Sequence, residues 1–269
     1  MAQDVVGSIP TSRPICRILS LVTGTREHAH QRGEIYAGCS GWAYPSWKPD
    51  FYPDSVPPKK LLEYYATRLN SVEVNYTFRH LPSASTVKTW LDATGPGFRF
   101  SFKAPQRITH ILRLNNCQEA VLRFADSIRP VAEVNRHGLI LFQLPPNMKA
   151  DNKRLSAFLT DADKIAFRLA FEFRNESWFG AETYSVLRDH GASLCIAESD
   201  ELSTPEEYTA PFSCYRIRKS EYSDGDLAAI TSKLRERSAK GDVFAYFKHE
   251  ESPVGALRAV NVLEGLRNA

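Results

Sequence analysis

Three side chains in this sequence have the chemistry of acid–base or covalent catalysis, and each lies within an apolar or β-branched run that is predicted to be a strand. They are Glu73, Lys103 and Glu172. Two glutamates can transfer protons when their surroundings keep one of them protonated. A lysine can form a Schiff base when its pKa is lowered, but an ion pair with Glu73 or Glu172 is the interpretation we favour. We predict these three residues as the catalytic candidates.

Other polar and aromatic side chains occupy similar positions and are candidates for binding a substrate. Side chains in a strand alternate between two faces, so Asn75 shares the face of Glu73 and Arg174 shares that of Glu172. The predicted binding residues are Trp42, Asn75, Gln143, Arg174, Trp178, Glu198, Arg216, Arg218, Lys248 and His249. Charged residues are rarely buried without a partner, so a network of ion pairs with no catalytic role would explain the same pattern.

A divalent metal is a weaker explanation of these residues. Glu73, Glu172, Glu198 and His249 are possible ligands. The neighbouring lysine and arginine side chains would crowd such a site with positive charge, whereas a metal prefers anionic and neutral ligands. We therefore predict no metal site. No G-x-G-x-x-G or P-loop motif is present, so we predict no cofactor.

The basic residues late in the chain predict an anion site. Arg216 and Arg218 belong to one apolar run, while Lys248 and His249 end the next. Barrels often bind phosphate after their seventh and eighth strands, and a helix beginning near 252–255 would add backbone N–H donors. A solvated basic rim is the alternative.

An aromatic segment rich in proline follows the first apolar run. We expect it to form a rigid loop over the mouth of the barrel, with Trp178 beside it. Such a loop can stack a sugar or a base, or can serve as a hydrophobic lid. Its aromatic residues are Trp42, Tyr44, Trp47, Phe51 and Tyr52.

Eight short apolar runs alternate with helical patterns and must position these candidates. The predicted strands cover 35–42, 71–78, 98–104, 138–144, 166–173, 192–199, 214–218 and 243–248. Helices are predicted over 59–69, from 83 or 85 to 91, and over 116–132, 151–159, 181–189, 223–241 and from 252 onward, whereas 200–211 is predicted as a loop. This alternation implies parallel strands, and eight of them favour a single (β/α)8 TIM-type barrel.

Length and composition agree with one globular barrel. The chain has 269 residues, of which 43% are hydrophobic and 24% charged, with a net charge of +3. That charge argues against a strongly basic nucleic-acid module, and no apolar stretch approaches the ~18 residues of a membrane helix. The five cysteines contain no C-x-x-C pair and fit a cytoplasmic protein with free thiols. Residues 1–33 lack periodicity and are predicted to be a flexible extension, with the barrel domain over 34–269.

Several motifs together resemble the YecE-like family, which is catalogued as domain of unknown function seventy-two. They are Gly38-Cys39-Ser40-Gly41-Trp42, Phe51-Tyr52-Pro53, Glu73-Val74-Asn75, Lys103-Ala104-Pro105, Thr109-His110, Phe142-Gln143-Leu144-Pro145-Pro146 and Glu172-Phe173-Arg174. The resemblance covers about residue 35 to the C-terminus and implies a TIM barrel, but it supplies no reaction. Many members have Arg-x-His-Gly where this chain has Arg216-Ile217-Arg218-Lys219, which implies a more anionic ligand here.

These observations lead to three hypotheses about function. The first is a barrel enzyme that acts on an anionic small molecule, phosphorylated or sugar-like, by proton transfer. The second is a nucleic-acid-binding or phosphodiesterase barrel of endonuclease type, against which the near-neutral net charge weighs. The third is a non-catalytic barrel that serves as a scaffold. The sequence does not predict the oligomeric state.

Overall fold

The structure is a computed structural model that describes residues 32–199, 202–248 and 252–267. The flexible extension predicted over 1–33 lies outside the described residues, apart from Arg32 and Gly33. The backbone N–H of Gly33 donates to the carbonyl of Ser238 at 2.7 Å, so the described chain begins on the barrel.

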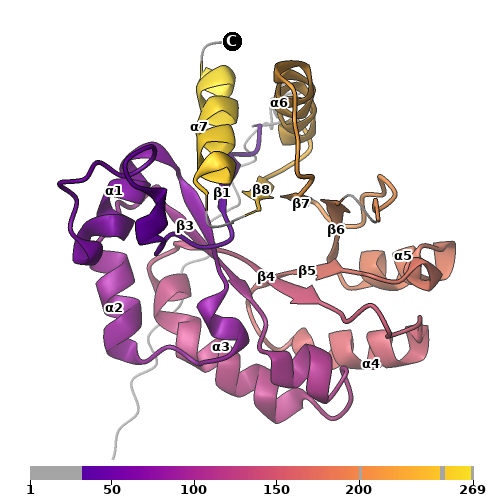
Figure 1. The fold of residues 1–269 in the computed structure, drawn as a ribbon. Helices are drawn as coiled ribbons and strands as arrows, with labels where there is room; N and C mark the ends of the chain where they lie inside the picture. The colour runs from indigo at the N-terminus through magenta and orange to yellow at the C-terminus, as the bar shows by residue number, and fades with distance from the viewer. Residues whose placement is uncertain (1–31, 200–201, 249–251, 268–269) are drawn as a thin grey trace, which may run out of the picture. The chain divides into compact units, whose positions relative to one another are not determined.

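Eight parallel strands form one sheet that curls into a barrel, in the order β1-β8-β7-β6-β5-β4-β3-β2 (Figure 1). They are β1 Ile35–Cys39, β2 Ser71–Val74, β3 Arg99–Lys103, β4 His137–Gln143, β5 Arg168–Glu172, β6 Ser193–Glu198, β7 Ser213–Ile217 and β8 Val243–Phe247. Each pair of neighbours in this order is parallel. The predicted TIM-type barrel is confirmed, and the eight predicted strands are all present.

Helices connect the strands and surround the barrel (Figure 1). They are α1 Leu61–Arg68, α2 Ala84–Asp92, α3 Gln118–Glu133, α4 Asn152–Ala162, α5 Ala181–Asp189, α6 Asp224–Ser238 and α7 Val254–Arg267. The start of α6 is a capping box, in which Ser223 and Asp226 bond each other's backbone N–H groups as their spacing predicts. Between β6 and β7 the described residues contain no helix, which agrees with the predicted loop.

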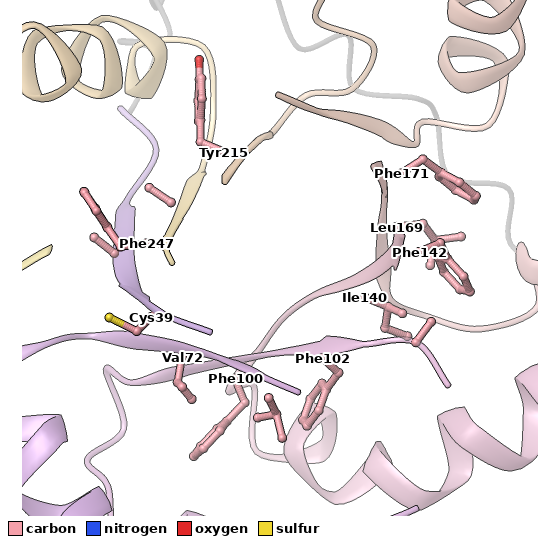
Figure 2. Packing of buried hydrophobic residues seen from close by; sticks show 14 of the residues in the cluster. Cys39, Val72, Phe100, Phe102, Ile140, Phe142, Leu169, Phe171, Tyr215 and Phe247 are labelled. Atoms are coloured by element: carbon pink, nitrogen blue, oxygen red, sulfur yellow. The ribbon is translucent and has the colours of Figure 1, made fainter. Parts of the chain in front are cut away.

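Alternation along each strand divides the apolar side chains into two layers. One small layer fills the barrel interior and includes Leu139, Leu141 and Tyr246. The larger layer lies between the strands and the helices, and Figure 2 shows Phe100 and Phe102 within it. Because the period is two, the residues between these outward side chains must face the barrel axis. The polar residues at the strand ends therefore face one another.

Side chains close the barrel where β1 meets β2. Asn70 accepts a hydrogen bond from the Ala37 N–H at 2.8 Å and donates to the Ile35 carbonyl at 2.8 Å. The Tyr65 hydroxyl accepts from the Cys39 N–H and donates to the Ser71 carbonyl. These two side chains satisfy backbone groups that a strand ladder would otherwise pair.

The strand predicted over 71–78 is shorter than expected. It ends at Val74, because Asn75 has helical backbone angles and a turn of 3-10 helix follows over Tyr76–Phe78. Asn75 therefore reaches the barrel mouth from a turn and not from a pleated strand. In the parts of the chain that the structure describes, no helix has the length and apolarity needed to cross a membrane.

Removal of the Asn70 side chain should destabilise the barrel. Asn70→Ala leaves the Ala37 N–H and the Ile35 carbonyl without partners, and an unsatisfied buried group costs about 1–3 kcal/mol. We expect a loss of about 2 kcal/mol in the free energy of unfolding, measured by urea titration. Asn261→Ala, at an exposed position of α7, is the control and should change stability little. Equal stability of the two variants would contradict a role for Asn70 in closing the barrel.

Candidate functional site

A fully buried arginine joins two buried glutamates at the carboxyl ends of the strands. Arg216 of β7 donates from Nη2 to Glu73 Oε1 of β2 at 2.7 Å and from Nη1 to Glu172 Oε2 of β5 at 2.6 Å. The exposed fractions are 1% for Arg216, 0% for Glu73 and 4% for Glu172. Nη2 also lies 3.3 Å from Ser40 Oγ. Burial of these charges is tolerated only because they neutralise one another.

Both carboxylate oxygens of Glu172 are occupied. Oε2 accepts from Arg216, and Oε1 accepts from the amide of Gln143 at 2.8 Å. Burial alone would raise the pKa of Glu172, but the Arg216 charge and these hydrogen bonds outweigh burial and hold the pKa below its usual value. Glu172 is therefore ionised at neutral pH and has no proton to donate.

Lys103, the last residue of β3, has no carboxylate partner in the described part of the chain. Its Nζ lies 4.4 Å from the centre of the Phe78 ring, and it forms no ion pair with any residue that the structure describes. The expected ion pair with Glu73 or Glu172 is wrong, because Arg216 occupies both carboxylates. Burial and the charge of Arg216 lower the pKa of Lys103 to about 8, although Glu73 and Glu172 oppose this shift.

A cavity of about 380 Å³ opens beside these groups. Two further cations in its wall, Arg174 and Arg218, also have no ion pair among the described residues. Burial and the neighbouring Arg216 lower the pKa of Arg218, which remains a cation at neutral pH. The cavity brings together six predicted site residues besides Lys103, namely Asn75, Gln143, Glu172, Arg174, Arg216 and Arg218.

Two predicted binding residues with aromatic side chains do not line this cavity. Trp178 is fully buried, stacks on Phe173 and donates its indole N–H to the Met148 carbonyl at 2.8 Å. Trp42 packs edge-on against Trp90 of α2. These two aromatic side chains are packing residues, because the segments that carry them fold back onto the core.

Glu198 also lies outside the cavity. The basic residues that predict an anion site are divided between two cavities. Glu198 forms an ion pair with Lys219 at 3.3 Å. Lys248 lines a second cavity of about 340 Å³ at the start of α7, together with Lys219 and Arg258. Arg216 and Lys248 thus line different cavities, and the anion site predicted from both residues stays a prediction. His249 lies outside the described residues.

His110 is a further functional candidate that is not among the site residues predicted from the sequence. It lies in a π-helical turn over Arg107–Ile111, and its Nδ1 is 2.8 Å from Thr109 Oγ1. Its ring stands edge-on to Phe78, the ring beneath Lys103. Burial and the charges of Lys103 and Arg174 lower the pKa of His110, so it is neutral at pH 7. π-Helical turns occur frequently at functional sites, but a sequence pattern does not reveal them.

The described residues contain no group of three or more histidine, cysteine, aspartate or glutamate side chains placed to hold a metal ion. Glu73 and Glu172 face the same guanidinium, which occupies the space between them. A divalent cation at this point would meet the positive charge of Arg216.

Comparison with known families agrees with the architecture and the motifs. A family model described as "Protein of unknown function DUF72" matches residues 36–269. The chain belongs to the DUF72 family. The resemblance predicted from the strand-end motifs is therefore confirmed.

Relatives of this DUF72 chain are found in Escherichia coli and Bacillus subtilis. The UPF0759 protein YecE of Escherichia coli K12 is 35% identical over 170 residues, which cover 61% of this chain and 59% of the relative. The UPF0759 protein YunF of Bacillus subtilis strain 168 is 27% identical over 155 residues, which cover 56% and 54%. The matched segments span less than two thirds of the length of these curated relatives.

Solved structures share the barrel. A DUF72 family protein from Thermotoga maritima superposes with a TM-score of 0.78 at 26% identity, over 87% of this chain and 99% of the other. A sugar phosphate isomerase/epimerase from Parabacteroides distasonis gives a TM-score of 0.52 at 13% identity, over 87% and 93%. The second likeness shows a common fold only.

Removal of the Arg216 charge should change both the stability of this DUF72 chain and its response to pH. Arg216→Met leaves two buried carboxylates without a counterion, which should cost about 3–5 kcal/mol at pH 7. Without Arg216, burial should raise the pKa of Glu172 above that of the unfolded chain, so the folded variant takes up a proton. Its stability should therefore increase as the pH falls from 7 towards about 5.

The natural chain should respond in the opposite direction. Its Glu172 has a lowered pKa when folded, so this contribution to stability is present above the unfolded pKa and is lost as the pH falls below about 4. Urea titrations from about pH 2 to 8 would measure both effects. Arg129→Met, at an exposed ion pair of α3, is the matched control. A triple variant that also carries Glu73→Gln and Glu172→Gln should regain stability at pH 7. An Arg216→Met variant as stable as the control would contradict this account.

Proposed function

We propose that this chain is an enzyme that binds an anionic small molecule, phosphorylated or sugar-like, in the barrel cavity and transfers a proton on it. One observation carries the proposal. Lys103, Arg174 and Arg218 line a single cavity, and none of them pairs with a carboxylate among the described residues. Cations that face a common space without partners favour an anion there.

The surrounding charges support the same conclusion. The single positive charge of Arg216 meets two carboxylates, so Glu73 and Glu172 offset one of the three charges of Lys103, Arg174 and Arg218 and leave the described part of the site positive. The cavity lies at the carboxyl ends of the strands, where the active sites of TIM barrels are found. A scaffold with no chemistry would be expected to pair these charges and to leave no cavity above them.

Unsatisfied polar atoms support a ligand that carries hydroxyl groups. Asn75 Oδ1 and Arg216 Nε are buried, belong to residues of the cavity wall and have no hydrogen-bond partner among residues 32–199, 202–248 and 252–267. Buried polar groups are nearly always bonded, to protein, water or ligand. A polyol can donate a hydroxyl proton to Asn75 and offer an oxygen to Arg216, which fits a sugar-like substrate.

We assign proton transfer to Lys103 and not to Glu73 or Glu172. Glu172 is ionised and has both oxygens occupied, and Glu73 does not line the cavity. Lys103 lines it and has a pKa of about 8, so its ammonium and amine forms are both populated near neutral pH. A group with a pKa near the working pH is the most effective general base. Glu73 and Glu172 act as positioning residues that fix Arg216.

Binding of inorganic phosphate tests the anion site. We expect the chain to bind phosphate, and Arg218→Gln to weaken binding by about tenfold, because a charge-assisted hydrogen bond contributes about 1.5–3 kcal/mol. Arg174→Gln should have a smaller effect, since that side chain is exposed to water. Isothermal titration calorimetry at low salt would measure the dissociation constants.

Arg129→Gln serves as the matched control for these substitutions. Arg129 is exposed on α3, so its variant should bind phosphate as the natural chain does. Loss of binding in Lys248→Gln, together with unchanged binding in Arg218→Gln, would place the anion in the second cavity and contradict the proposal. Absence of any phosphate binding would contradict it as well.

A further inference from the structure

We infer that Lys103 is a nucleophile that forms a Schiff base, and that the substrate is therefore an aldehyde or ketone carrying a phosphate or carboxylate group. This inference rests on the proposed function, because it takes the same cavity as the binding site. It goes further by naming a covalent step and the functional group that the substrate must have.

The position of the Lys103 amine supports a nucleophilic role. Lys103 ends β3, lines the cavity, and has its Nζ over the face of Phe78. A lysine that serves only as a fixed charge would be expected to contact a carboxylate. Here the two nearest candidates are held by a stronger competitor, since Arg216 binds Glu73 and Glu172 at 2.7 and 2.6 Å.

Burial and the neighbouring arginines favour the unprotonated form of the Lys103 amine. Arg216 and Arg218 of β7 disfavour an added positive charge at Lys103, while Glu73 and Glu172 favour it, and burial disfavours it most. A lysine that is desolvated or lies next to other cations is activated as a nucleophile, because more of it is unprotonated. With a pKa of about 8 against an ordinary 10.5, Lys103 has on the order of 100 times more free amine at pH 7.5 than a surface lysine.

Two arginines of the cavity wall can bind the anionic group of the substrate. Arg174 and Arg218 line the same cavity and have no carboxylate partner among the described residues. They can hold a phosphate or carboxylate while the carbonyl carbon meets Lys103. Binding through a remote anion positions the reacting atoms and so promotes the reaction.

The step balances without any further reagent. The unprotonated Nζ of Lys103 adds to the carbonyl carbon, so a C–N bond forms and the carbonyl electron pair moves to oxygen. The oxygen takes up a proton lost by the nitrogen and gives a carbinolamine. Water then leaves with that oxygen, and a C=N bond remains. The imine nitrogen then takes up a proton from water, and the protonated imine withdraws electrons from the adjacent carbon, so that a proton can pass from that carbon to water. In this step Lys103 promotes the proton transfer as the electron-withdrawing imine and not as a free base.

Reductive trapping tests this inference on the full-length chain. The probe is dihydroxyacetone phosphate with sodium cyanoborohydride at pH 7.5, and the neutral control is dihydroxyacetone. Peptide mapping by mass spectrometry would compare the adduct at Lys103 with that at Lys88, whose side chain is 74% exposed. We expect Lys103 to be labelled at least ten times faster than Lys88, and the preference to be much weaker with the neutral ketone. Pyruvate, with acetone as its control, tests a carboxylate in the same way.

Two variants make the test specific. Lys103→Arg keeps the charge but cannot form an imine, so it should lose the adduct while it retains phosphate binding. Arg218→Gln should reduce labelling by dihydroxyacetone phosphate more than labelling by dihydroxyacetone, because loss of the Arg218 charge also raises the pKa of Lys103 and slows both reactions. Because the natural chain alone yields the Lys103-to-Lys88 ratio, a variant that fails to fold would not prevent the test.

The outcomes separate this inference from the proposed function. Phosphate binding that depends on Arg218, with no preferential labelling of Lys103, would overturn the Schiff base and leave the anion site standing. Neither binding nor labelling would overturn both. Preferential labelling of Lys103 by the anionic probes would support both.

Discussion

Arg216 connects opposite sides of the barrel through two short ion pairs, and the arrangement of the candidate site depends on it. The guanidinium lies in the interior, where a lone charge would be very costly, and Glu73 and Glu172 compensate it from β2 and β5. The planar fork of arginine has enough donors to bond two carboxylates at once. Lysine at this position would lack that geometry, so the interaction explains why β7 carries an arginine.

The same ion pairs determine the chemistry of the neighbouring residues. Glu172 is held ionised, and Gln143 bonds the oxygen that Arg216 leaves. Within the part of the chain that the structure describes, Lys103 is left without a counterion, over an aromatic ring and close to positive charge, and its pKa falls to about 8. A network whose two carboxylates are structural therefore produces an activated lysine at the edge of the cavity. Pairs of groups whose environments shift their pKa values apart are typical of active sites.

Much of the fold could be predicted from the sequence, because its signals are local. A run such as 138–144 is apolar on both faces, as expected for a strand buried on both sides, and β4 occupies His137–Gln143. The capping residues at Ser223 and Asp226 also marked the start of α6 correctly. The period of two placed Glu172 and Arg174 on one face, and both residues line the cavity.

The pairing of charges could not be predicted, because it depends on residues that are distant in the chain. Arg216 lies 143 residues from Glu73 and 44 residues from Glu172, and nothing local shows that it is a better partner for them than Lys103. A local sequence pattern also does not predict which way the Trp178 side chain points. An aromatic residue after a strand can face either the mouth or the core, and here Phe173 and the Met148 carbonyl hold it in the core.

The most direct test of this account is the titration of Lys103 itself. Two-dimensional NMR of the natural chain with ¹³C at the lysine Cε positions would follow each amine, and the Lys103→Arg spectrum would assign the Lys103 signal. The account predicts a midpoint near pH 8 for Lys103. A midpoint near 10.5, the ordinary value for lysine, would show that a counterion or water stabilises the ammonium, and would contradict the claim that Arg216 leaves Lys103 unpaired.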